Sequence, residues 1–223
     1  MKKLLAIDTS TEQASIALLI DGVSMGEEQG SQKTQAQVLL PMIDSLLRKA
    51  NLHLNQLDGI VFGRGPGSFT GLRIACSIAK GLAYAHDLPL FPVSSLASIA
   101  WAARRELGND KVPVLSLLDA RMNELYWGFF PDLSYQTEER VTRPEDILIS
   151  ANEPIVLAGV GTEVYWERLP KALQLMVRDR LALFPLASNM VEMVNTLAIQ
   201  AVSTAQAQPL YVRNQVTQGD ARG

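Results

Sequence analysis

The stretch "KLLAIDTSTEQASIALLIDGVSMGEEQG", residues 3–30, predicts three consecutive β-strands. The first strand is expected in "KLLAIDTS" (3–10), an apolar run that ends at polar residues. Two more are expected on either side of Asp21-Gly22, a pair that favours a tight hairpin turn. A doubly wound nucleotide-binding fold alternates strands and helices from its first element. Three antiparallel strands in succession therefore indicate a different kind of α/β protein.

The segments after these strands predict helix, strand, helix and strand. Apolar residues spaced as on one helix face predict a helix over about 33–50, in which Thr34 and Gln37 form a capping box. Pro41 lies inside this pattern, so the helix either kinks there or begins near it. The later elements are a strand in 57–65, a helix from Ser68, its N-cap, to about His86, and a strand in 88–94.

The second half of the chain repeats this order of elements. The expected elements are strands in 111–121, 124–130 and 154–160 and helices near 143–150 and within 188–202. The secondary structure of residues 171–187 is left undecided, because "KALQLMVRDRLALF" (171–184) fits either a short hairpin around Arg178-Asp179 or a helix.

The repeated order predicts the fold class. It matches the half-unit of the actin, hexokinase and Hsp70-type ATPases (the ASKHA fold), an α/β fold with two lobes that each hold a mixed sheet flanked by helices. We expect an N-terminal lobe over 1–100, to which segment 204–213 returns, and a C-terminal lobe over 101–203. The polar residues 214–223 are expected to form a loose tail.

The composition limits the function classes. With 223 residues, 48% of them hydrophobic, the chain can bury one large core or two small ones. The formal net charge is −3 and the basic residues are scattered in pairs, which argues against tight nucleic-acid binding by this chain alone. No apolar run reaches membrane-spanning length, so we expect a cytoplasmic protein without a membrane partner. Cys76 lies in an apolar helical pattern and is expected to be a buried thiol.

A glycine-rich loop, "FGRGPGSFTGLRIA" (62–75), leads from an expected strand into an expected helix. Such loops often hold phosphate, but this one lacks the Lys-Ser/Thr pair of a Walker loop and the third glycine of the dinucleotide fingerprint. Small residues four apart on the helix that follows form a ridge without bulk, which lets another element approach closely. We therefore expect an architectural role first for the loop residues Gly63, Gly65, Pro66, Gly67 and Ser68.

Five segments together carry a resemblance to one protein family. They are "LAIDTSTEQASIAL" (5–18), "QVLLPMIDSLL" (37–47), "GRGPGSFTGLRI" (63–74), "LLDARMNELYW" (117–127) and "PLYVRN" (209–214). In this order and over almost the whole chain, they resemble the TsaB (YeaZ) family of bacterial partners of TsaD, the enzyme that makes threonylcarbamoyladenosine on tRNA. The glycine-proline loop is the most specific of these segments.

The resemblance implies an ASKHA fold and a non-catalytic subunit. Such a subunit pairs with TsaD, joins the small ATPase TsaE in a ternary complex, forms a homodimer in isolation, and meets tRNAs that read ANN codons only through the complex. The resemblance also implies that the first two helices form the pairing surface. The interface residues expected from it are Leu39, Met42, Ile43, Leu46, Leu47, Gly71, Leu72, Ala75, Ala79 and Ala83. Whether Ala75 or Ala79 faces outward stays open.

A nucleotide cleft is the second candidate site. Asp8, Thr9 and Ser10 resemble the first phosphate loop of the ASKHA ATPases, and Asp119 is placed to face them across a cleft. Arg121 stands where that family's second phosphate loop has glycine with threonine or serine, so we expect a vestigial cleft. Asp8 is then a turn-capping residue or a ligand, and Asp119 forms a local ion pair or caps a hairpin. No cofactor is assigned to this chain, and ATP with Mg²⁺ is expected at most in the complex.

Metal catalysis is not expected. In the family that the chain resembles, the catalytic paralogue TsaD is a metal enzyme with histidines four apart on a helix. This chain has only His53 and His86, each expected near a helix C-terminus, and Gln35 where relatives carry a histidine. The scaffold subunit is the main interpretation. An actin-type kinase or ATPase is the alternative, and a metallopeptidase has the least support.

Overall fold

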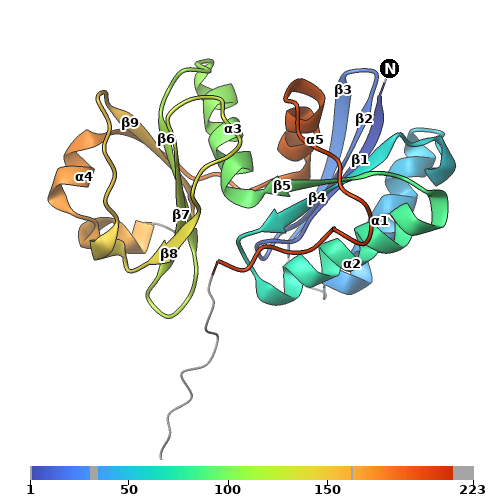
Figure 1. Cartoon of the computed structure of the whole chain (residues 1–223), viewed down its shortest axis with the longest axis horizontal. Helices are drawn as coiled ribbons and strands as arrows, with labels where there is room; N and C mark the ends of the chain where they lie inside the picture. The colour runs from blue at the N-terminus through green and yellow to red at the C-terminus, as the bar shows by residue number, and fades with distance from the viewer. Residues whose placement is uncertain (1, 31–34, 162, 213–223) are drawn as a thin grey trace, which may run out of the picture.

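The computed structural model describes residues 2–30, 35–161 and 163–212, which form two five-stranded sheets with helices between and outside them (Figure 1). The first sheet has the order β3-β2-β1-β4-β5, with β1 to β3 antiparallel and β4 and β5 parallel to β1. Its strands are β1 (Lys3–Asp8), β2 (Ala14–Ile20), β3 (Val23–Gln29), β4 (Gly59–Gly65) and β5 (Leu90–Ser94). The three predicted strands are confirmed, and the turn residues Asp21 and Gly22 both have positive φ, at 51° and 88°.

The second sheet repeats the first, strand for strand. Its order, β10-β9-β6-β7-β8, again has three antiparallel strands followed by two parallel ones. Its strands are β6 (Val114–Asp119), β7 (Leu125–Phe130), β8 (Arg140–Thr142), β9 (Ile155–Val160) and β10 (Val177–Leu181). Two mixed sheets of the same topology, flanked by helices, confirm the predicted fold class.

Two helices fill the space between the sheets. α5 (Ala187–Thr196) packs on β1, β2 and β4, whereas α3 (Ser95–Leu107) packs on β6, β7 and β9, and the two helices touch each other (Figure 1). Side chains such as Leu4, Val156 and Met190 from both sheets and from α5 join one central core. The two halves of the chain therefore share their largest apolar core.

Helices also cover the outer face of each sheet. α1 (Gln35–Lys49) and α2 (Phe69–His86) cover the first sheet, and the short helices η3 (Glu163–Arg168) and α4 (Lys171–Met176) cover the second. Alternate residues of a strand point to opposite faces of a sheet, so Leu4 lies in the central core and Leu5 in the core under α1 and α2.

Several elements differ from the sequence prediction. α3 was missed in the sequence, and in the structure Ser95 to Arg104 are all buried between the sheets, so its serines mark no exposed face. The helix expected near 143–150 is only the single turn η2 (Pro144–Asp146), and the three-residue strand β8 was missed beside it. Segment 171–184 contains both α4 and β10, rather than a hairpin or one helix.

The two helices of the first half lie where the pattern predicts them. α2 is confirmed, and Ser68 caps it, since Ser68 Oγ accepts a hydrogen bond from Gly71 N at 3.2 Å. α1 runs unbroken through Pro41, whose side chain lies on the exposed side of the helix, where water can bind the carbonyl that proline leaves without a donor. The proposed Thr34 cap and the tail 214–223 lie outside the described residues.

The described C-terminal residues run back along the first half. Val202 pairs with Leu90 through two backbone hydrogen bonds of 2.8 and 3.1 Å, Lys80 Nζ donates to Ala207 O, and Leu210 N donates to Arg64 O at 2.7 Å. The predicted lobe limits at residues 100 and 203 stay a prediction. No helix among the described residues is long and apolar enough to cross a membrane.

Arg104 on α3 gives a test of the central packing. Its side chain is buried, with Nε donating to Val112 O at 3.1 Å and Nη2 to Phe130 O at 2.8 Å, and burial lowers its pKa to about 10. We expect Arg104→Met to lower the free energy of unfolding in urea by about 3 kcal/mol, because two buried carbonyls lose a charged donor. The exposed neighbour variant Arg105→Ala should cost less than about 1 kcal/mol, and equal losses would contradict this account.

Candidate functional site

The glycine-rich loop folds closely over the turn that follows β1. Ser68 N donates to Ser10 O at 2.7 Å, and Thr9 Oγ1 donates to Gly71 O at 2.7 Å. A β-carbon at Gly71 would lie 1.8 Å from Thr9 O, and one at Gly67 would lie 2.3 Å from Ser10 O. These two glycines are therefore required by contact with the chain's own backbone, without a bound phosphate.

Asp8 lies under this loop and not on a surface. It is 1% exposed, and Oδ1 accepts hydrogen bonds from Ser10 N at 3.1 Å and Ser10 Oγ at 2.8 Å. Oδ2 has no hydrogen-bond partner among the described residues, and a β-carbon at Gly63 would lie 1.8 Å from it. Burial raises the pKa of Asp8 to about 7, although both bonds from Ser10 lower it. The carboxyl group thus caps its own turn.

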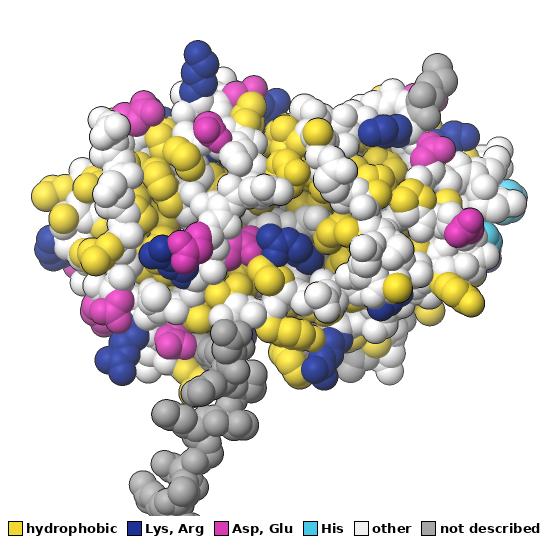
Figure 2. Space-filling view, viewed as in Figure 1, with side chains coloured by type: hydrophobic (Ala, Val, Ile, Leu, Met, Phe, Trp, Pro, Cys, Tyr) yellow, Lys and Arg dark blue, Asp and Glu magenta, His cyan; other side chains and the backbone are white. Residues whose placement is uncertain are grey.

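A cleft of about 860 Å³ separates the two halves. Ser10, Thr11 and the first residues of α2 line one wall, and Asp119, Arg121 and Met122 line the other. Figure 2 shows the surface hollowed between the two halves. The structure places Ser10 and Asp119 on the lining of one cleft, whereas Asp8, which Asp119 was expected to face, is buried behind the first wall.

The second wall is a tight hairpin turn after β6. Asp119 Oδ1 accepts hydrogen bonds from Arg121 N at 2.8 Å and from Tyr165 Oη at 3.2 Å, and Oδ2 lies 3.3 Å from Arg121 Nη1. Arg121, Met122 and Asn123 all have positive φ, between 54° and 62°. Asp119 therefore both caps the turn and pairs with Arg121, which engages both carboxylate oxygens.

A buried ion pair that the sequence analysis missed connects the two halves. Glu139, in the segment between β7 and β8, lies 3.1 Å from Arg64 Nη1 and accepts a hydrogen bond from Ser94 Oγ. Its side chain is 5% exposed, so burial raises its pKa, while the Arg64 charge lowers it. Ser94 also caps α3 through Ala97 N at 3.1 Å. No motif marks Glu139, because its partners come from distant segments.

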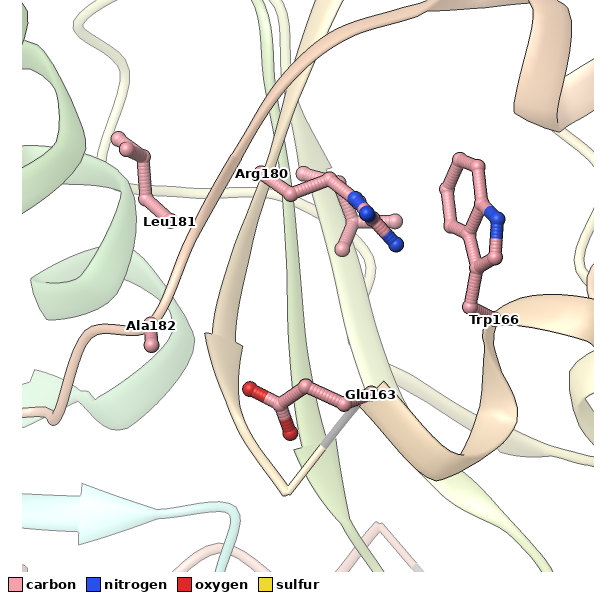
Figure 3. Close-up of a pocket in the computed structure, with 6 residues that line it drawn as sticks. Glu163, Trp166, Arg180, Leu181 and Ala182 are labelled. Atoms are coloured by element: carbon pink, nitrogen blue, oxygen red, sulfur yellow. The ribbon is translucent and has the colours of Figure 1, made fainter.

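A smaller pocket of about 320 Å³ lies beside η3 and β10 (Figure 3). Figure 3 shows Arg180 reaching toward the ring of Trp166, and Arg180 Cζ lies 4.4 Å from the ring centroid. The Glu163 carboxylate points toward Ala182 in the same view. Buried Leu157 lines the pocket, so an apolar wall meets two exposed charges there.

Comparisons with known proteins identify the family. The chain is 38% identical to the tRNA threonylcarbamoyladenosine biosynthesis protein TsaB of Haemophilus influenzae, over 96% of this chain and 94% of that protein. It is 34% identical to the Escherichia coli protein of the same name, over 96% of each. The chain belongs to the TsaB family.

Two further comparisons agree with this TsaB assignment. The family described as "TsaD: tRNA N6-adenosine threonylcarbamoyltransferase" matches residues 29–208. The solved structure of YeaZ from Pseudomonas aeruginosa is 37% identical and superposes with a TM-score of 0.85, over 95% of this chain and 100% of that one. The resemblance drawn from the five sequence segments is confirmed.

The ten residues expected for TsaB pairing are all buried inside the single chain. They form the packing of α1 and α2 on the first sheet. The expectation that Ala75 or Ala79 faces outward is wrong, because both are 0% exposed. The stripe of small residues lets α2 lie close to its own sheet. A partner that binds these helices would therefore meet their other side chains.

The two histidines of this TsaB-family chain lie apart from the cleft. His86 ends α2, as predicted, but His53 precedes the short helix η1 (Leu54–Gln56), where its N–H donates to Gln56 Oε1 at 2.8 Å. In the part of the chain that the structure describes, no three His, Cys, Asp or Glu side chains are grouped to hold a metal ion. Cys76 is buried, as expected, and burial raises the pKa of its thiol.

The close contact at Gly71 gives a matched pair of variants on one helix. Gly71→Ala should lower the free energy of unfolding by about 2 kcal/mol or more, because the added β-carbon displaces the Thr9 backbone. A β-carbon at Gly81 meets nothing within 4 Å, so Gly81→Ala should raise it by about 0.5–1 kcal/mol. Denaturant unfolding of both variants measures this, and a neutral Gly71→Ala would show that the loop does not need glycine there.

The raised pKa of Asp8 predicts a pH-dependent stability. Between the ordinary carboxyl pKa of 3.8 and about 7, folded Asp8 keeps a proton that the unfolded chain releases, so stability falls as the pH rises through this range. Asp8→Asn removes this dependence. Its free energy of unfolding relative to wild type should therefore rise by roughly 4 kcal/mol or less from pH 4 to pH 8. A constant difference over this range would contradict the raised pKa.

Proposed function

We propose that this chain acts in threonylcarbamoyladenosine biosynthesis as a non-catalytic subunit that binds TsaD. The main support is the similarity over nearly the full length to two proteins named TsaB for that pathway. The geometry of the cleft agrees, since its first loop is held by its own backbone and its second wall is a capped turn.

The proposal includes the assembly expected for the family. The chain pairs with TsaD, TsaE joins the pair, and tRNA is met through the complex, in the cytoplasm. The isolated chain forms a homodimer through the surface that TsaD would otherwise cover. Supporting features are the exposed and half-buried apolar side chains of α1 and α2, of which Ile74, Ile78 and Leu82 also pack against the core beneath the helices.

We define the outer α1/α2 face by its exposed and half-buried residues. They are Leu40 and Pro41 on α1 and Ile74, Ile78, Gly81, Leu82 and Ala85 on α2. Leu40 is 51% exposed, and Gly81 leaves open space above the helix. Apolar and small residues on two neighbouring helices suit a helix pair of a partner, and a stable interface needs about 800 Å² from each side.

A kinase or ATPase is less well supported by the same site. Asp8 is buried and does not line the cleft, so it does not face a magnesium ion there. Asp119 is engaged by Arg121 and Tyr165. ATP with Mg²⁺ therefore belongs to the complex in this proposal. Magnesium-dependent ATP hydrolysis by the purified chain would favour the alternative.

Gly81→Arg tests the partner surface. The arginine has room on the helix and keeps the fold, but it places a charge in the centre of the outer α1/α2 face. We expect at least about a hundredfold loss of TsaD affinity by calorimetry, loss of the homodimer, and a matching fall in tRNA modification by the reconstituted complex. The control Ala201→Arg adds the same charge at an exposed site on another segment and should bind normally. Normal binding by Gly81→Arg would place the interface elsewhere.

A further inference from the structure

We propose that Phe69, Arg73 and Tyr211 form a stacking platform for an unpaired base of RNA at the mouth of the cleft. The inference rests on the proposed function, because the RNA is the one that the complex modifies. It goes further in assigning this chain a direct contact with nucleic acid, which its overall charge does not predict.

The three side chains hold one another in place. Arg73 Cζ lies 3.8 Å from the centroid of the Phe69 ring, and Arg73 Nε donates to Tyr211 Oη at 3.1 Å. The rings of Phe69 and Tyr211 are 5.4 Å apart and tilted by 44°. Residues from the start of α2 and from the C-terminal segment are thus fixed as one unit, so little side-chain freedom is lost when a ligand stacks on them.

The platform is exposed in spite of its apolar character. Phe69 is 46% and Tyr211 43% exposed, and both line the cleft of about 860 Å³. Large exposed rings at the edge of a cavity mark a binding surface, and a flat ring with a nearby cation is the usual surface for a nucleobase. The volume is sufficient for one nucleoside.

The charges of the cleft favour a base rather than a phosphate inside it. Glu12, Asp119 and Arg121 line the interior, and Arg121 is paired with Asp119, so this charged part of the lining has no net positive charge that would hold a phosphate group. Arg73 is exposed and has no carboxylate partner among the described residues, so its charge is available to the phosphate backbone outside. An RNA strand would therefore run past Arg73 with one base turned into the cleft.

The platform also lies on a different side of α2 from the proposed TsaD surface. Arg73 and Lys80 face the C-terminal segment, which they contact at Tyr211 and Ala207. Given 100° and 1.5 Å per residue, Ile74, Ile78 and Ala85 lie about 100° or more around the helix from Arg73, and Gly81 lies about 80° around and about 12 Å along it. A partner seated on the outer α1/α2 face therefore leaves the platform open to a strand held by the complex.

The test uses the complex of the full chain with TsaD and a fluorescein-labelled tRNA anticodon stem-loop. We expect Phe69→Ala to weaken RNA binding about tenfold by fluorescence anisotropy and Phe69→Ala/Tyr211→Ala to weaken it further. Tyr211→Phe keeps the ring and should stay within about twofold of wild type. Tyr84→Ala removes another exposed ring of α2, 81% exposed, and is the matched control. TsaD affinity is measured by calorimetry for each variant.

Each outcome of these experiments either supports or overturns the stacking platform. Stem-loops carrying 4-thiouridine should cross-link to peptides that contain Phe69 or Tyr211, and cross-links to TsaD alone would overturn the platform. Unchanged RNA affinity of the Phe69→Ala/Tyr211→Ala variant would also overturn the platform. So would a variant that loses TsaD or ATP binding but still binds RNA normally. If the wild-type chain does not bind TsaD, the proposed function fails and the platform fails with it.

Discussion

The arrangement of the first half depends on one close backbone approach, where the glycine loop meets the turn after β1. The Gly71 and Thr9 backbones come so near that a β-carbon would lie 1.8 Å from the Thr9 oxygen. This contact fixes where β4 ends and where α2 begins. Since α2 starts at the cleft, the same contact places Ser68 and Phe69 on the cleft wall. A loop whose composition suggests phosphate binding is thus used to join two neighbouring elements.

Local sequence patterns predicted the strands that form apolar runs and the helices α1 and α2, and they missed α3 and β8. The strands of the first half were marked by apolar runs and by the Asp21-Gly22 turn, α2 was marked by its N-cap and its apolar spacing, and all of them lie where expected. α3 has no exposed face over most of its length, because it is enclosed between two sheets, and even its residues Ser95, Ser98 and Arg104 are buried. Strand β8 has three residues and no pattern of its own. Both depend on contacts between distant segments, which a local period does not contain.

The candidate site also depends on contacts that a local sequence pattern does not contain. The period of α1 and α2 correctly grouped Leu39, Ile43 and Ala75 on shared faces, but it could not tell whether a face meets the chain's own sheet or another protein. Burial decides that question, and these residues belong to the core. The ion pair of Glu139 with Arg64 could not be predicted from local patterns either, because 75 residues separate the partners along the chain.

Helix α2 connects the features that bear on function. Its buried side rests on the first sheet, one flank contacts the C-terminal segment, and its N-terminus lines the cleft. Its remaining side is turned outward, next to α1. The proposed TsaD surface and the proposed RNA platform therefore use different side chains of the same helix. The glycine loop holds the N-terminus of α2 by direct backbone contact, so the cleft wall and the outer face keep a fixed position relative to each other. The proposed role, in which the chain positions TsaD beside an RNA, requires such a fixed arrangement.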